Sequence, residues 1–205
     1  PDQMIHALQF QSRTRRNRPA LRRLIRSVLD GDEEYLTRHP RNRRWLKQLA
    51  VNTSAESARA WAELPSLTRE LEGLGRVTIA PECEPLEALR MGTYVGSCYG
   101  QGGSFRFAAT AVVMDANKHV VFARDAKGTF LARQIMAISF DWTLACYAVY
   151  PLQDDTELAF LFGDYNVQIA EVLGIALATE DDEDVEIQNL VSTDDGDDGI
   201  WSPDT

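Results

Sequence analysis

The chain has 205 residues, of which 44% are hydrophobic and 9% aromatic, so its composition excludes a wholly disordered protein. No apolar run approaches the roughly 20 residues that a membrane span needs, and residues 1–6 lack the charged and apolar segments of a signal peptide. The net charge of −10 hides a strong segregation, because residues 1–50 carry +7, residues 51–150 carry −1 and residues 151–205 carry −16.

The first 75 residues are predicted to be helical. Apolar residues at a spacing of three and four predict an amphipathic helix over 20–29. Ser54 is a candidate N-cap for one of the helices that follow. These further helices are expected at 33–38, 43–49, 55–64 and from Pro65 through Leu74.

After residue 76 the pattern changes to short runs of Val, Ile, Phe and Thr separated by Asx and glycine turns, which predicts an antiparallel β-meander. A short helix is expected at 82–90, followed by a turn-rich loop at Gly92–Gly103 that changes conformation or binds a partner. The strands of the meander are expected at 77–80, 105–114, 119–124, 129–139 and 143–150.

Beyond the meander, apolar residues at helical spacing predict one long helix over 157–173 that ends at Gly174. Weak strands are expected at 175–178 and 185–191. The sequence therefore predicts an α+β protein in which the long helix packs on the sheet. Its three parts are an Arg-rich helical segment at 1–75, a mixed domain with an antiparallel sheet at 76–191 and an acidic tail at 192–205.

The order of meander strands, helix and strand over 119–178 is similar to that of the GNAT acetyltransferase fold. In that family a glycine-containing loop before the helix binds the pyrophosphate of acyl-CoA. At the corresponding place, residues 150–157 contain three carboxylates and no glycine, a composition that would repel a pyrophosphate. The resemblance therefore implies a degenerate GNAT-like fold and does not carry over the activity.

Two clusters of basic residues lie in the helical segment. Guanidinium clusters neutralise phosphates and an interleaved aromatic side chain can stack on bases, so nucleic-acid binding is one hypothesis. The acidic C-terminal region competes for the same arginines, which favours an acidic protein partner or self-contact. The candidate partner-binding residues are Arg15, Arg16, Arg22, Arg23, Arg26, Arg41, Arg43, Arg44 and Trp45.

Residues 95–99, Val-Gly-Ser-Cys-Tyr, resemble the nucleophile segment of papain-like proteases, which reads Cys-Gly-Ser/Ala-Cys-Trp/Tyr. The resemblance implies a nucleophilic role for Cys98, but Val95 replaces the first Cys of the motif, and the family's histidine would lie beyond the end of this sequence. A pair of Cys98 and His119 on neighbouring strands, oriented by Asp115 or Asp141, is an alternative. A small structural thiol on a tight turn is the favoured interpretation.

The remaining signals favour binding over catalysis. Cys83, Cys98 and Cys146 have no metal-like spacing, as expected for reduced thiols of a cytoplasmic protein. We expect a non-catalytic protein-interaction or regulatory subunit of a larger bacterial-type assembly, with no cofactor, no metal and no membrane contact. The alternatives are an enzyme, either a GNAT-like acyl transferase or a Cys98-dependent hydrolase, and a nucleic-acid-binding accessory protein.

Overall fold

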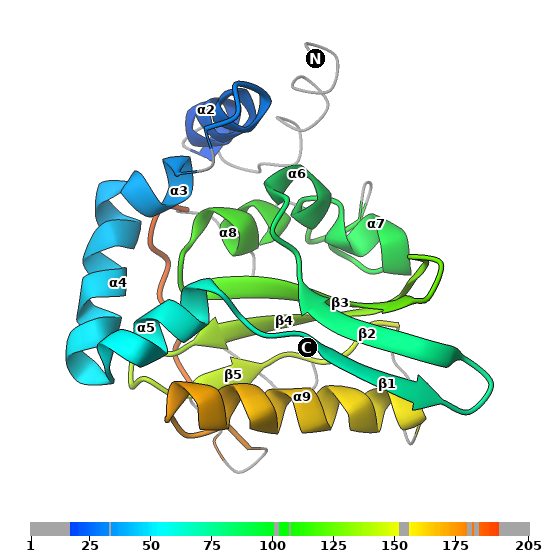
Figure 1. The fold of residues 1–205 in the computed structure, drawn as a ribbon. Coiled ribbons are helices and arrows are strands. Elements are labelled where there is room, and N and C mark those ends of the chain that lie inside the picture. Colours follow the sequence, from blue (N-terminus) through cyan, green and yellow to red (C-terminus); the bar gives the residue numbers. More distant parts are fainter. Residues whose placement is uncertain are drawn as a thin grey trace.

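A computed structural model describes residues 17–32, 34–100, 103–106, 108–151, 156–179, 182 and 185–192. Its centre is an antiparallel sheet of five strands, in which each strand pairs with the next one along the chain (Figure 1). The strands are β1 (Leu67–Leu71), β2 (Gly75–Pro81), β3 (Lys118–Asp125), β4 (Phe130–Ile138) and β5 (Leu144–Cys146).

Helices cover both faces of this sheet (Figure 1). Those before β1 are α2 (Asn17–Leu29), α3 (Tyr35–Arg38), α4 (Pro40–Asn52) and α5 (Ala55–Ala62). Those after β2 are α6 (Pro85–Ala88), α7 (Met91–Val95), α8 (Ala108–Met114) and α9 (Glu157–Leu173).

Strand alternation separates the core into two layers, because successive side chains of a strand point to opposite faces. In β3, Val121 packs in the layer under α4, α5 and α9, and Val120 and Phe122 pack in the layer under α6, α7 and α8. A third cluster joins α2, through Leu21 and neighbouring apolar residues, to Met114 of α8. The Arg-rich helices therefore share a core with the sheet domain.

The long helix α9 confirms the sequence prediction. Thr156 caps it by accepting a hydrogen bond from the N–H of Ala159 at 3.2 Å, and Gly174 ends it in the left-handed conformation with φ 64°. Its inner face buries Leu161, Tyr165 and similar side chains against the sheet, each contributing about 1.5–3 kcal/mol of transfer free energy.

Two predicted elements are wrong in type. Residues 67–71, predicted as helix, form β1, and the predicted domain boundary after residue 75 falls within the hairpin of β1 and β2. Residues 108–114, predicted as strand, form α8, whose Ala-rich run is buried along nearly its whole length. A short apolar run has the same appearance in a buried helix and a buried strand, and here alanine content favours the helix.

The weak strands predicted after α9 are also absent from the part of the chain that the structure describes. Residues 175–178 form only an isolated parallel bridge between Leu144 and Leu177, and 185–191 form no strand. The α+β class with an antiparallel meander and a long packed helix is confirmed, and the resemblance to the GNAT fold is not.

Candidate functional site

The arginines of α2 and α4 lie on the molecular surface. Arg22, Arg23 and Arg26 of α2 are exposed, because Leu21, Leu24 and Ile25 form the face of the helix that is buried. None of the candidate arginines in the described ranges forms an ion pair with another described residue. On α4 the exposed arginines are Arg41, Arg43 and Arg44, whereas Arg15 and Arg16 lie outside the described residues.

The positive charges of the two helices meet at His39, the residue that precedes α4. Burial lowers the pKa of His39, and the positive charges of Arg41 and Arg23 lower it further. Arg41 belongs to α4 and Arg23 to α2, so charges from both helices act on the imidazole of His39. We call the exposed arginines at 18–26 and 41–44 the basic surface.

Trp45 does not belong to this surface. Its side chain is 3% exposed and its ring packs edge-on against Trp61 and parallel to Trp142, with centroid separations of 6.5 and 6.2 Å. It therefore cannot stack on a base or contact a partner while the fold is intact. Trp45 is a core residue, and the basic surface lacks the aromatic side chain that the nucleic-acid hypothesis used.

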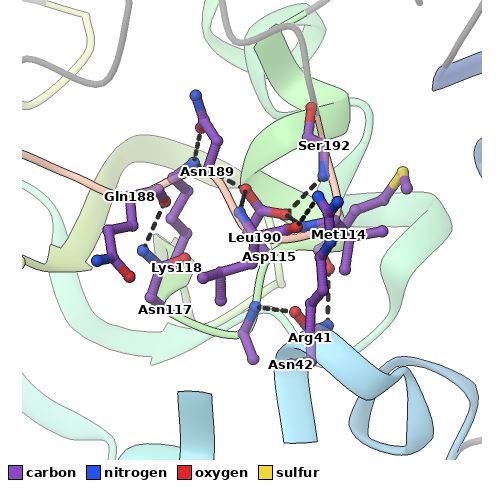
Figure 2. Close-up of polar contacts among 12 residues, drawn as sticks. Arg41, Asn42, Met114, Asp115, Asn117, Lys118, Gln188, Asn189, Leu190 and Ser192 are labelled. Atoms are coloured by element: carbon purple, nitrogen blue, oxygen red, sulfur yellow. Dashed lines mark hydrogen bonds and ion pairs between the residues drawn. The ribbon is translucent and has the colours of Figure 1, made fainter. Parts of the chain in front are cut away.

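The C-terminal residues 185–192 are docked by one carboxylate at the turn between α8 and β3 (Figure 2). Asp115 Oδ1 accepts hydrogen bonds from the N–H groups of Val191 at 2.7 Å and Ser192 at 2.9 Å. Its Oδ2 accepts a further bond from the N–H of Leu190 at 3.2 Å. Three consecutive backbone donors at the end of this segment are thus satisfied by a single side chain.

The same turn supplies two more contacts. Lys118 Nζ lies 3.0 Å from Asp115 Oδ2 and donates to Asn189 Oδ1 at 2.9 Å, and Asn117 Nδ2 donates to the carbonyl of Gln188 at 2.8 Å. The Lys118 and Asp115 side chains are only 7% and 0% exposed, so this ion pair is shielded from solvent. The sequence predicts a turn at these residues but does not predict their contacts with Gln188 and Asn189, which lie 71 positions further along the chain.

The docked segment ends between the two Arg-rich helices. Arg41 Nη1 of α4 donates to the carbonyl of Leu190 at 2.9 Å, and Asn17 Nδ2, at the start of α2, donates to Ser192 Oγ at 2.9 Å. The next residues, 193–205, include five aspartates and lie outside the described residues. The acidic stretch thus begins at a position that is fixed beside the basic surface.

The candidate catalytic residues are not brought together. Cys98 packs with the layer of the core under α6–α8, whereas the His119 ring contacts Trp61 in the layer on the opposite face of the sheet. Asp141 lies on the surface in the turn after β4. The five-stranded sheet stands between Cys98 and His119, so these residues do not form a nucleophile–base pair in this fold.

The glycine-rich loop is tightly packed. An added Cβ at Gly92 would lie 2.1 Å from the nitrogen of Gly100, and one at Gly103 would lie 2.0 Å from the carbonyl oxygen of Cys98. These glycines therefore allow close backbone contacts, and α7 occupies the first part of the predicted loop. Gln101 and Gly102 lie outside the described residues.

Arg133, the last basic residue of the sequence, lies under this loop. It is 0% exposed, its Nη2 donates to Ser97 Oγ at 3.1 Å, and its Nε and Nη1 have no hydrogen-bond partner among the described residues. Its guanidinium carbon lies 4.9 Å and 4.8 Å from the ring centroids of Tyr99 and Tyr150. Burial lowers the pKa of Arg133, because the charged guanidinium loses its hydration. A desolvated cation–π contact contributes about 2 kcal/mol, which offsets part of this desolvation cost.

Among the described residues, no group of three or more His, Cys, Asp or Glu side chains is arranged to hold an ion. No disulfide links the three cysteines; Cys83 is exposed, and Cys98 and Cys146 are half-buried. Burial raises the pKa of Cys146 far above that of an ordinary thiol.

The fold and the basic surface define an α+β protein with a docked C-terminal segment. No protein-family model and no curated protein matches the chain. Over the described ranges, no helix has the length and apolar content that crossing a membrane requires.

Proposed function

We propose that the protein is a non-catalytic, regulatory protein-binding subunit whose basic surface binds an acidic surface of a partner protein. The single observation that carries this proposal is the position of Ser192, hydrogen-bonded to Asn17 at the start of α2, where the acidic stretch begins. The aspartates of 193–205 then compete with the partner for the same guanidinium groups.

The charge balance supports a protein partner. The exposed arginines have no carboxylate partner among the described residues, so their charge is available at the surface. The chain as a whole carries −10, which opposes approach to a polyanion such as DNA but leaves a local positive surface able to select a complementary acidic patch. The burial of Trp45 removes the base-stacking aromatic from the nucleic-acid alternative.

Reach is sufficient for the acidic stretch to compete. A chain spans up to about 3.3–3.6 Å per residue when extended, so a stretch of six residues has a maximal span of about 20 Å. Charged groups that belong to one chain meet at an effective concentration that can reach the millimolar range, which suits the weak affinity of a few aspartates for surface arginines. Such competition lowers the affinity of the basic surface for every partner moderately, so that strongly acidic partners are selected over weakly acidic ones.

The experiment compares the full chain with a variant that ends at Ser192. Binding of a fluorescent 12-residue poly-Glu peptide is measured by anisotropy between 20 and 300 mM salt. We expect the truncated chain to bind about two- to tenfold more tightly than the full chain, with both affinities falling as salt rises. The triple variant Arg22→Glu/Arg26→Glu/Arg44→Glu should abolish binding. The control is Arg59→Glu/Arg76→Glu/Lys127→Glu, which changes the net charge equally at exposed positions outside α2 and α4.

A DNA duplex of 20 base pairs serves as the second probe. Tighter binding of the duplex than of the acidic peptide, with a steep salt dependence, would replace the protein partner with a nucleic acid. Equal peptide affinity of the full and truncated chains would refute competition by the acidic stretch. Equal affinity of the triple variant and the wild type would refute the basic surface as the binding site.

A further inference from the structure

A cavity of about 330 Å³ lies where the N-terminal helices meet the sheet domain. Its walls come from α3 and α4, the end of α5, the connection from β2 to α6, the end of α8 and the start of β3. The volume is at the lower end of the range for small-molecule sites, roughly 300–1,000 Å³, and such sites favour junctions between structural units. The basic surface is formed by other side chains.

His119 presents one defined hydrogen-bonding atom in the lining. Its Nε2 lies 2.9 Å from the carbonyl oxygen of Trp61, and because a carbonyl only accepts, Nε2 carries the proton. Burial lowers the pKa of His119 to about 4, so the ring is neutral near pH 7. Nδ1 therefore has a lone pair, and it has no partner among the described residues.

The other polar groups of the cavity are largely occupied. Lys118 is paired with Asp115, and Glu82 Oε2 is 2.5 Å from Arg124 Nη2, so these lining charges are neutralised inside the protein. Asn42 donates to the carbonyls of Leu36 and Met114. Glu63, exposed and without an ion pair to a described residue, is the remaining lining charge, so an anionic ligand would find no free counter-charge here and any ion would lose hydration on entry.

The remaining walls favour a flat apolar ligand. Trp61 and His119 meet edge to face, with ring centroids 4.5 Å apart and planes at 68°, and both line the cavity. Leu46, Pro81 and Val112 add apolar surface. A ring in this space gains the contact energy of an aromatic pair and can donate one hydrogen bond.

We propose that this cavity binds a small, uncharged, mainly apolar ring compound that donates one N–H or O–H hydrogen bond to Nδ1 of His119. The apolar walls supply most of the affinity, and the single acceptor selects donors over isosteres that lack the hydrogen. Neither the basic surface nor the acidic stretch takes part. This binding site is therefore independent of the proposed function.

The test compares indole with 1-methylindole, which differs by the loss of the N–H donor. Titration calorimetry on the full chain should give an affinity for indole about fivefold higher, the contribution of one net hydrogen bond. The Nδ1 resonance of His119 in ¹⁵N NMR should move with indole and not with 1-methylindole. Indole should also slow the reaction of Cys83, an exposed thiol of the lining, with a thiol reagent.

Two variants complete the design. His119→Phe keeps a ring against Trp61 and removes the acceptor, so indole and 1-methylindole should then bind equally. Arg76→Glu, on the exposed part of β2 and absent from the lining, should retain the fivefold preference. Equal binding of the two compounds to the wild-type chain, an unmoved Nδ1 resonance, or no indole binding at millimolar concentration would overturn the proposal.

Discussion

Replacing Asp115 by Asn is expected to lower the free energy of unfolding by about 4 kcal/mol. The carboxylate accepts three backbone N–H groups and pairs with Lys118, and its side chain is 0% exposed. The amide keeps one acceptor oxygen, turns an NH₂ group toward donors and leaves the Lys118 charge unpaired. Removing one partner of a buried ion pair costs about 3–5 kcal/mol, which sets the magnitude.

Urea unfolding and amide hydrogen exchange measure this effect together. In Asp115→Asn the midpoint should fall, and the amides of Leu190 to Ser192 should exchange faster because their acceptor is weakened. Asp182→Asn is the control, since this exposed carboxylate accepts side-chain hydrogen bonds only from Thr179 among the described residues, and its cost should stay within about 0.5 kcal/mol. Unchanged exchange at 190–192 in Asp115→Asn would refute the docking role of the carboxylate.

Two further predictions concern pH and packing. The pKa of His119, lowered from 6.5 to about 4, means that the unfolded chain binds a proton that the folded chain does not. Stability should therefore be complete above about pH 6.5 and fall by about 3 kcal/mol as the pH drops to 4, and His119→Gln should remove this part of the decline in urea titrations. In thermal unfolding, Gly92→Ala should lose about 3 kcal/mol because its Cβ would clash with the nitrogen of Gly100. Gly163→Ala, with no atom within 4 Å of the new Cβ, should gain about 1 kcal/mol, and equal effects of the two glycine variants would contradict the packing argument.

The elements predicted best from the sequence are those with strong local signals. The helix over 157–173 combined a long helical spacing with a glycine terminator, and the structure has the same bounds. The strands β3 and β4 are apolar runs bounded by Asx or glycine turns, and both were likewise predicted. In each case the signal lies within the element itself, so tertiary contacts need not be known.

The elements predicted wrongly depend on neighbours in space. Leu67 and Leu71 have a spacing that suits a helix, but pairing with β2 places them in a strand. The apolar run at 108–114 is buried on nearly all sides, so no periodicity distinguishes helix from strand. Local propensity is a weak guide where tertiary contacts decide the conformation.

Of the candidate site, only the positions of the exposed charges could be predicted from the sequence. The Arg-rich faces of α2 and α4 follow from the apolar spacing on their opposite faces. Trp45 was predicted as a partner-binding residue, whereas it lies on the buried face of α4 with Leu49. The contacts of Asp115 with residues 190–192 join parts of the chain about 75 positions apart, and a single sequence carries no signal for such pairs.

The contact between Asn17 and Ser192 spans 175 residues, so it also constrains the order in which the chain acquires its structure. During synthesis, the residues of α2 and α4 leave the ribosome long before residues 190–192, which contact both helices in the folded protein, and before the aspartates of 193–205 that we propose as competitors. Contacts of such large sequence separation form late, because closing the intervening loop costs entropy that earlier contacts do not recover. On the proposed function, the nascent chain therefore presents its Arg-rich segment before the acidic residues that would compete for it have been made.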